Sequence, residues 1–257
     1  MNNPRPKIVA TIEARMTSTR LPGKVLLKTA GKPLLAHLVE RVRKSRFIDE
    51  IVVATTANDT DDPIAGLAAQ LGIKSWRGSE EDVLGRVLEA ARASDAAVIV
   101  ELTGDNPLID PELIDEAIRF YFENPADYVS NFLGPELPDG FPVQVFSTDV
   151  LADADSRTEN EDDREHVTLY IRRNSDRYSI KAVPVAADLN RPDVSLTLDE
   201  PADYEVISAV FEALYPKDPN FTIRDCLAYL DKNPNVKSKN RDAKRKSVRG
   251  HWSAYSA

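Results

Sequence analysis

Three cationic side chains stand close together near the start of the chain. Arg15, Arg20 and Lys24 occupy one stretch, with Ser18 between them. Guanidinium, ammonium and backbone amide groups are the usual donors to phosphate oxygens, so this stretch suits a polyphosphate anion. The alternative is a solvated basic loop that binds no ligand.

Two aspartates would complete such a site. Asp105 follows an apolar run in the sequence Thr-Gly-Asp-Asn-Pro, and Asp199 follows another in Leu-Asp-Glu-Pro. The carboxyl ends of parallel strands meet at one edge of a sheet, so both carboxylates are expected beside the cationic stretch. Mg²⁺ takes few protein carboxylates together with phosphate oxygens and waters, which fits phosphoryl or nucleotidyl transfer. Both aspartates could instead be turn or cap residues, which are common after strands.

Alternating strands and helices are needed to bring these residues together. Apolar, β-branched runs predict strands at 7–12, 50–56, 73–77 and 97–102, and helical apolar spacing predicts helices at 33–42, 64–71, 83–94 and 111–123. Ser79 is the expected N-cap of the third helix. This alternation predicts an α/β fold with a mainly parallel central sheet flanked by helices.

The alternation stops after residue 123. We expect strands at 128–132, 143–146 and 178–185, a short helix at 149–155, and a helix that runs from a charged entry at 160 to about 173. This pattern predicts a smaller lobe, about 128–185, inserted over the sheet, with its last strand returning to it. A further strand at 195–198 leads into Asp199, and a helix at 202–214 closes the body.

The end of the chain differs in composition. We therefore expect a single domain over 1–235 and a basic C-terminal tail over 236–257. The tail is expected to be a solvated, poorly ordered segment. The alternative is an arm that packs on a neighbouring subunit through Trp252 and Tyr255.

The net charge, the cysteine and histidine content and the absence of certain motifs exclude several classes of protein. The net charge of the 257-residue chain is −9, which argues against a general nucleic-acid binder. Cys226 is the only cysteine, and the three histidines lack metal-ligand spacing, so neither a disulfide framework nor a cysteine or histidine metal site is expected. Neither a P-loop nor a dinucleotide-binding glycine motif is present. The chain has no signal peptide or membrane span, which predicts a cytoplasmic protein without a membrane partner.

The sequence of the cationic stretch, Arg15-Met-Thr-Ser18-Thr-Arg20-Leu21-Pro22-Gly23-Lys24, resembles a known signature. It is similar to the N-terminal motif of the cytidylyltransferases that make CMP-activated acidic sugars, the 3-deoxy-manno-octulosonate and acylneuraminate enzymes. Over about residues 5–215 the chain resembles the spore coat polysaccharide biosynthesis protein F group of that superfamily. The resemblance implies a Rossmann-like nucleotidyltransferase fold, CTP, Mg²⁺ and a homodimer built through the inserted lobe.

The resemblance also implies roles for individual residues. It implies that Arg15, Lys24 and Asp105 are catalytic and that Asp105 and Asp199 bind the metal. The implied nucleotide-binding residues are Ala14, Arg15, Ser18, Arg20, Lys24, Ser79 and Arg86.

A second stretch resembles the sugar site of the octulosonate enzymes. The run from Glu165 to Arg173 is similar to their His-x-x-x-Tyr-x-x-Arg pattern, which implies that His166, Tyr170 and Arg173 bind the acceptor. Helical spacing independently places these three side chains on one face, and ordinary packing is the alternative reading of that face. Asp139 and Gln144 are also expected to face the sugar.

The expected reaction is CTP plus a sugar hydroxyl giving a CMP-sugar and pyrophosphate, for cell-surface polysaccharide or glycoconjugate synthesis. A 2-keto-3-deoxy acid is the expected sugar, although Asn106 stands where the octulosonate enzymes carry an acidic residue. One alternative is a sugar-phosphate or polyol-phosphate nucleotidyltransferase. A nucleotide-sugar-dependent glycosyltransferase would usually show an Asp-x-Asp motif, where this chain has Gly104-Asp105-Asn106. A non-catalytic, nucleotide-binding regulator is the last alternative.

Overall fold

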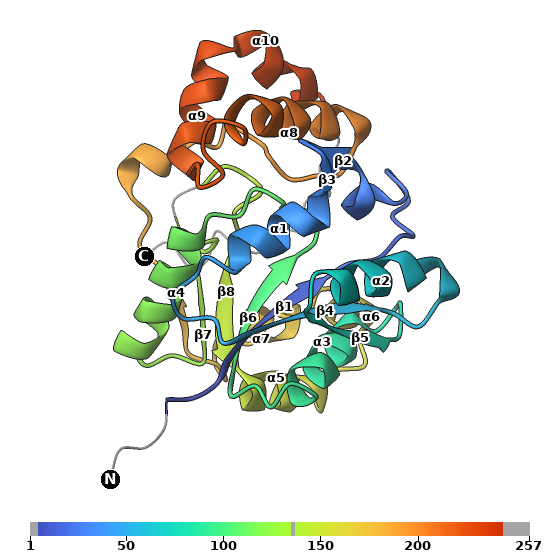
Figure 1. The fold of residues 1–257 in the computed structure, drawn as a ribbon. Coiled ribbons are helices and arrows are strands. Elements are labelled where there is room, and N and C mark those ends of the chain that lie inside the picture. Colours follow the sequence, from blue (N-terminus) through green and yellow to red (C-terminus); the bar gives the residue numbers. More distant parts are fainter. Residues whose placement is uncertain (1–4, 135–136, 244–257) are drawn as a thin grey trace.

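Seven strands form one sheet at the centre of a computed structural model that describes residues 5–134 and 137–243 (Figure 1). Their order in the sheet is β5-β4-β1-β6-β8-β7-β9. The strands are β1 (Ile8–Glu13), β4 (Glu50–Thr56), β5 (Lys74–Gly78), β6 (Val98–Thr103), β7 (Tyr128–Ser130), β8 (Gln144–Ser147) and β9 (Ile180–Ala182). A separate small hairpin consists of β2 (Lys28–Thr29) and β3 (Lys32–Pro33).

The first half of the sheet is parallel. β1 lies between β4 and β6, and Glu13 at its end pairs in register with Ala54 on one side and Thr103 on the other. β5 continues this parallel set, whereas β8 runs antiparallel to both β6 and β7. The predicted α/β fold with a mainly parallel sheet is therefore confirmed, and the ends of β1, β4 and β6 share one edge.

Helices cover both faces of the sheet, as predicted. They are α1 (Leu34–Val42), α2 (Asp62–Gln70), α3 (Val83–Arg92), α4 (Pro111–Glu123), α5 (Thr148–Asp155), α6 (Glu161–Glu165), α7 (Leu169–Arg173), α8 (Pro201–Leu214), α9 (Ile223–Lys232) and α10 (Pro234–Lys237). Alternate residues of β1 enter two different cores. Ile8, Ala10 and Ile12 pack with α1, α2, α4, α8 and α9, and Val9 packs with α3, α5 and α7. Glu13 has the same parity as Val9, so it belongs to the α3 side of the sheet.

The segment 128–185 contributes more to the central sheet than we expected. All three of its strands, rather than the last one alone, join the sheet beyond β6. Tyr128 and Val129 are fully buried, as are Val145 and Phe146. Strands buried in this way need partners for their backbone groups, and the sheet supplies them. The part of the segment that leaves the sheet consists mainly of α5, α6 and α7.

The expected single helix from 160 to 173 is wrong. The chain forms α6, then turns at residues 166–168, and then forms α7. Val167 has a φ of 23°, outside the helical region, and its side chain is buried in the core beside α3 and α5. Burial of this side chain outweighs the helical preference of the flanking residues. His166 therefore lies outside the helix that carries Tyr170 and Arg173, and the three do not share one helical face.

Two smaller expectations are also wrong. The segment 195–198 is not a regular strand, because it makes only an isolated bridge between Ser195 and Asp139. The N-cap of α3 is Asp82, whose carboxylate accepts a hydrogen bond from the Gly85 amide, whereas the Ser79 hydroxyl accepts one from the Asp82 amide. Ser79 therefore closes the turn before the helix.

The expected boundary at residue 235 falls inside α10. A 3₁₀ helix, η4 (Ser238–Asn240), follows α10 and packs on α8, so the first residues of the expected tail belong to the body. Trp252 and Tyr255, the residues of the alternative arm, lie outside the described residues. Within 5–134 and 137–243, no helix is long and apolar enough to cross a membrane.

Candidate active site

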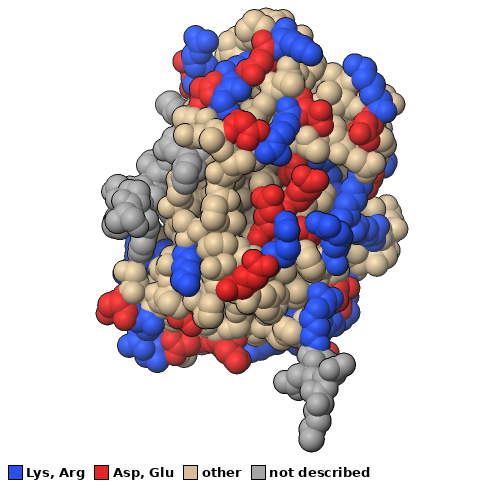
Figure 2. Space-filling model, turned by 90° about the vertical axis from the view of Figure 1, so that its left-hand side faces the viewer, with Lys and Arg blue, Asp and Glu red and all other residues tan. Residues whose placement is uncertain are grey.

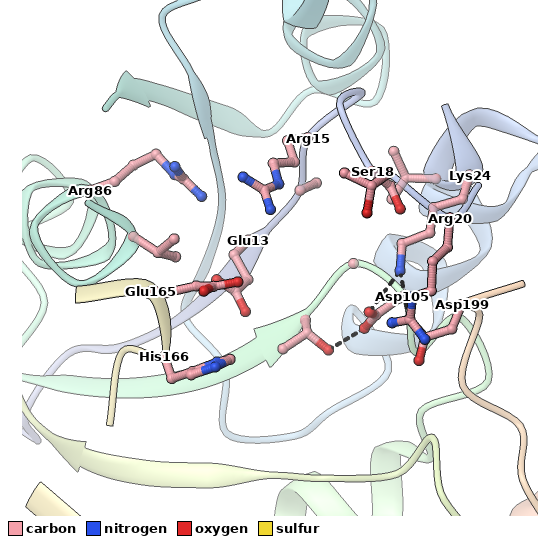
Figure 3. A pocket seen from close by; sticks show the side chains of 16 residues that line it. Glu13, Arg15, Ser18, Arg20, Lys24, Arg86, Asp105, Glu165, His166 and Asp199 are labelled. Carbon is pink, nitrogen blue, oxygen red and sulfur yellow. Dashed lines mark hydrogen bonds and ion pairs between the residues drawn. The ribbon is translucent and has the colours of Figure 1, made fainter. Parts of the chain in front are cut away.

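A cavity of about 350 Å³ lies at the carboxyl ends of β1 and β6 (Figure 3). It collects side chains from the loop after β1, from α3, from the loops after β6 and α6, and from the segment before α8. Its lining consists of Glu13, Ala14, Arg15, Ser18, Thr19, Arg20, Lys24, Val25, Val83, Arg86, Thr103, Gly104, Asp105, Glu165, His166 and Asp199. The sheet edge predicted from the sequence is thus the edge at which the cationic stretch and both aspartates meet.

Lys24 is the centre of the charged cluster. Its Nζ lies 3.0 Å from Asp105 Oδ2 and 3.1 Å from Asp199 Oδ1, and it donates to the Leu198 carbonyl at 2.7 Å. Arg20 Nη2 lies 2.8 Å from the same Asp199 oxygen. Three segments that are far apart in the sequence therefore converge on one ammonium group.

The opposite charges of this cluster favour each other's ionised forms. Burial lowers the pKa of Lys24, but the carboxylates of Asp105 and Asp199 outweigh it and raise that pKa. Burial likewise raises the pKa of Asp105, but Lys24 and the Thr103 hydroxyl, which donates at 2.5 Å, hold it below its usual value. Lys24 and Asp105 are therefore both charged at neutral pH.

The loop that carries the cations is anchored at its start and its end. The Met16 amide donates to Asp61 Oδ1 at 2.8 Å, and Asp61 is itself buried. The Gly23 amide donates back to the Met16 carbonyl at 2.9 Å, which closes the loop just before Lys24. Gly23 has a φ of 69°, a conformation that glycine adopts without strain. Lys24 then begins a 3₁₀ helix, η1 (Lys24–Leu26).

Arg15 pairs with a carboxylate from the connection between β5 and α3. Its Nη1 lies 3.4 Å from Glu80 Oε1, which also accepts a hydrogen bond from the Thr17 hydroxyl. The other oxygen of Glu80 accepts from Asn58 Nδ2 at 2.5 Å. Only one corner of the Arg15 guanidinium is in this ion pair, so its other donors are available to a phosphate group. Sequence reasoning missed Glu80, because the acidic run at 80–82 gives no sign of which carboxylate faces the loop.

Arg86 and Ser79 occupy different positions relative to the cavity. Arg86 is buried in its wall, and its Nη1 donates to the Ser79 and Glu80 carbonyls. The Ser79 side chain lies outside the cavity lining. Of the residues expected to bind the nucleotide, the structure thus brings together Ala14, Arg15, Ser18, Arg20, Lys24 and Arg86.

Two further carboxyl groups, those of Glu13 and Glu165, line the cavity beside the two expected aspartates, whereas Glu101 is not part of its lining. Burial raises the pKa of Glu13 to about 7, although Arg86, Arg15 and Lys24 oppose that shift. Glu101 is nearly fully buried in β6, and burial together with the nearby Glu13 raises its pKa well above the usual value. The position of Glu13 at the end of β1, in the parity that faces α3, is the sequence signal that could have identified it.

The residues expected to bind the sugar are dispersed. Among them only His166 lines the cavity. Tyr170 packs edge-on against Tyr178, with ring centroids 6.2 Å apart, and Arg173 pairs with Asp163 at 3.1 Å.

Gln144 and Asp139 also lie outside the cavity lining. Gln144, in β8, bonds to the buried Glu101 carboxylate and accepts hydrogen bonds from Tyr128 and Thr168, both at 2.6 Å. Asp139 forms the bridge to Ser195. Both residues support the sheet and its border in this structure.

The donor set can be tested against Mg²⁺. In the part of the chain that the structure describes, no group of three or more His, Cys, Asp or Glu side chains could hold a metal ion. Asp105 and Asp199, however, both lie within about 3 Å of one ammonium group, so they are close enough to share a cation. Oxygen-only ligands in small number are what Mg²⁺ uses when phosphate oxygens and waters complete its shell. The two aspartates fit the metal on that condition.

The chain is similar to a family of transferases and to two kinds of curated protein. A family model described as "Cytidylyltransferase" matches residues 9–230. The spore coat polysaccharide biosynthesis protein SpsF of Bacillus subtilis is 37% identical over 234 residues, with 89% of this chain and 96% of that protein covered. The 3-deoxy-manno-octulosonate cytidylyltransferase of Geobacter sulfurreducens is 44% identical over 121 residues, which cover 46% of this chain and 47% of that enzyme.

Solved structures show the same fold. A cytidylyltransferase from Leptospira borgpetersenii superposes with a TM-score of 0.85 and 29% identity, and the match covers 91% of this chain and 97% of the other. The structure of CMP:2-keto-3-deoxy-manno-octonic acid synthetase complexed with CTP has a TM-score of 0.62 and 22% identity, and the match covers 80% of this chain and 99% of the other.

Proposed function

Because the chain belongs to the cytidylyltransferase family, we propose that it transfers the cytidylyl group of CTP to a sugar hydroxyl with Mg²⁺ as cofactor. The acceptor oxygen attacks the α-phosphorus, the bond from that phosphorus to the bridging oxygen breaks, and pyrophosphate leaves. The hydroxyl proton is lost to solvent. The observation that carries this proposal is the convergence of Arg15, Arg20 and Lys24 with Asp105 and Asp199 in one cavity.

The protein's own groups would act mainly by position and charge. Arg15 and Arg20 would bind the phosphates, and Lys24 would stabilise the negative charge that develops as pyrophosphate leaves. Asp105 and Asp199 would hold Mg²⁺, which when bound orients the phosphates and neutralises their charge. Ala14, Ser18 and Arg86 line the same cavity and would contact the rest of the nucleotide. Ser79 would act through its carbonyl, which binds Arg86.

A 2-keto-3-deoxy acid is the acceptor that we propose to test first. The names of the Geobacter relative and of the CTP-bound structure support this class of sugar. His166 is the residue of the expected sugar set that lines the cavity. A role for Tyr170, Arg173, Gln144 or Asp139 in sugar binding would require a larger acceptor or a rearrangement of α7 and β8. The name of the Bacillus relative supports a use of the product in polysaccharide synthesis, and CTP as donor supports a cytoplasmic site.

Pyrophosphate release tests the proposal directly. Each nucleoside triphosphate is paired, with Mg²⁺, against 2-keto-3-deoxy acids, sugar phosphates and polyol phosphates. We expect release with CTP and a keto-acid sugar, and no release when EDTA replaces Mg²⁺. Release only with a phosphorylated acceptor would keep the reaction but replace the acceptor class. CTP binding without release from any pair would favour the nucleotide-binding regulator.

The expected homodimer is a separate proposal. Light scattering on the full chain should give twice its mass of 28.5 kDa. A monomer at every concentration would remove this proposal and leave the reaction untouched.

A further inference from the structure

The last described residues of the chain contact the segment that leads into Asp199 and α8. They follow residue 230, where the match to the family model ends, and they form α10 and η4. Asn240, at the end of η4, is only 6% exposed. An amide side chain buried at that level needs specific hydrogen-bond partners, because an unsatisfied polar group is costly in the interior. Its partners therefore show what this segment does.

The Asn240 amide joins two points of another segment. Its Nδ2 donates to the Ser195 carbonyl at 3.0 Å and to Asp203 Oδ1 at 2.8 Å. Ser195 begins the extended segment that precedes Asp199, and Asp203 lies in the first turn of α8. The two hydrogens of one amide group thus hold both ends of the turn that carries Asp199.

Asp203 continues this connection to Asp199 itself. Asp203 is fully buried, and its Oδ2 accepts hydrogen bonds from the backbone amides of Asp199 at 3.0 Å and Glu200 at 2.8 Å. The bond from the Glu200 amide forms one half of a capping box at the start of α8, and the bond from the Asp199 amide is additional to it. The position of the Asp199 backbone is therefore set by a carboxylate whose other oxygen is held by Asn240.

The segment 195–198 needs such support because the sheet does not provide it. It forms no ladder with a strand, and its backbone bonds go to Asp139 through Leu196 and to Asp105 through Leu198. Asp199 must nevertheless lie accurately, since its carboxylate meets Lys24 at 3.1 Å and Arg20 at 2.8 Å. A misplacement of about 1 Å can cost an enzyme roughly 10²-fold in rate.

We propose that Asn240 is a positioning residue, through which the C-terminal segment fixes Asp199 for metal and phosphate binding. The role of Asp199 in this statement rests on the proposed function. The hydrogen-bonded connection from Asn240 through Asp203 to the Asp199 amide stands independently of it.

The test compares Asn240→Ala and Asn240→Asp with Lys239→Ala in the full-length chain. Asn240→Ala removes both hydrogen bonds, and Asn240→Asp keeps the volume of the side chain but sets a carboxylate against Asp203, so the pair separates loss of packing from loss of the donor. Lys239 is the neighbouring residue, and its exposed ion pair with Glu205, at 2.7 Å, does not touch the Asp199 turn. Hydrogen exchange is followed at the amides of Asp199 and Glu200, with α4 as the internal reference. Turnover is measured as kcat and KM over a range of Mg²⁺ concentrations.

In both Asn240 variants the amide hydrogens of Asp199 and Glu200 should exchange about tenfold faster than in the wild type, while exchange in α4 stays at the wild-type rate. They should also lose about tenfold in kcat/KM and need more Mg²⁺ for half-maximal turnover. Lys239→Ala should match the wild type in every measurement. Unchanged exchange at Asp199 and Glu200, or an equal acceleration in α4, would overturn the proposal. If no acceptor supports turnover, the proposed function fails, whereas the exchange data still decide the role of Asn240.

Discussion

Lys24 has two kinds of partner in the proposed reaction, and the structure shows one of them. Its ammonium lies between Asp105 and Asp199, where it balances two carboxylates that would otherwise repel each other. Nucleotide and metal binding would exchange these partners, because the carboxylates would then bind the cation and the ammonium would bind phosphate. The same residue therefore balances the two aspartates in this structure and would serve the proposed chemistry.

Replacing Lys24 by Ala should abolish turnover while leaving the fold intact. Removal of one preorganised donor to a developing negative charge costs about 10²–10³-fold in kcat. Steady-state pyrophosphate release measures the loss, and circular dichroism checks the fold. Lys28→Ala is the matched control, because Lys28 is exposed and lies four residues further along the chain. Wild-type turnover by the Lys24 variant would contradict the assignment of the site.

Glu13 should make the stability of the protein depend on pH. Burial raises its pKa to about 7 from the ordinary value of 4.5, so between these values the folded protein holds a proton that the unfolded chain has lost. The free energy of unfolding contributed by this group is therefore highest below pH 4.5 and falls as the pH rises towards 7. Glu13→Gln should gain about 1–3 kcal/mol relative to wild type between pH 4.5 and pH 8. Urea titrations at both pH values measure this gain, and a difference that is the same at both would refute it.

At the scale of elements, the connection between β5 and α3 holds the cationic loop. Glu80 lies in this connection and binds Thr17 and Arg15. Asn58 lies in the loop after β4 and binds Glu80 in turn. This arrangement orients Arg15 from one corner and restrains the backbone beside it. It explains why the loop over residues 14–23 can present its cations in a fixed geometry.

Glu80→Ala should raise the KM for CTP by about tenfold and change kcat much less. The reason is that Arg15 would contact the phosphates in the ground state and the transition state alike, so its disorder weakens binding uniformly. Glu80→Gln keeps an acceptor for Thr17, so its KM for CTP should lie between those of the wild type and Glu80→Ala. Glu81→Ala is the control, because Glu81 is the exposed neighbour and does not line the cavity. A lower KM in Glu80→Ala would mean that Glu80 masks Arg15 instead of orienting it.

The elements that the sequence predicted well are those that carry their own local pattern. β4 and α4 match the expected ranges residue for residue, because an apolar β-branched run and a proline at the first helical turn are both local signals. The break at Val167 was not predictable, since burial in the core imposes its positive φ. Glu80 and Asn240 were missed for a related reason. Their roles depend on contacts with residues far away in the chain, which composition and spacing do not encode.

At the scale of the whole molecule, the cavity is not a basic patch. Its lining holds four cationic side chains, Arg15, Arg20, Lys24 and Arg86, and four acidic ones, Glu13, Asp105, Glu165 and Asp199. Figure 2 shows acidic and basic residues side by side across one face of the molecule, with acidic groups gathered near its centre. The protein around the cavity has a net charge of −9. A nucleotide therefore meets a repulsive field at long range and favourable contacts only at short range.

This balance predicts an unusual salt dependence for CTP association. Where cations steer an anion into its site, added salt slows association, because the Debye length falls to about 8 Å near 0.15 M ionic strength. Here the same screening weakens the repulsion by the net negative protein, so the association rate constant should stay level or rise by about twofold between roughly 20 and 200 mM KCl at fixed Mg²⁺. The dissociation rate should rise over the same range, since Arg15 and Arg20 are partly exposed and their phosphate contacts are screened. Stopped-flow measurements separate the two rates. A steep fall in the association rate with salt would show that the four cations dominate the field outside the cavity, and the charge of the whole molecule would then be irrelevant to capture of the nucleotide.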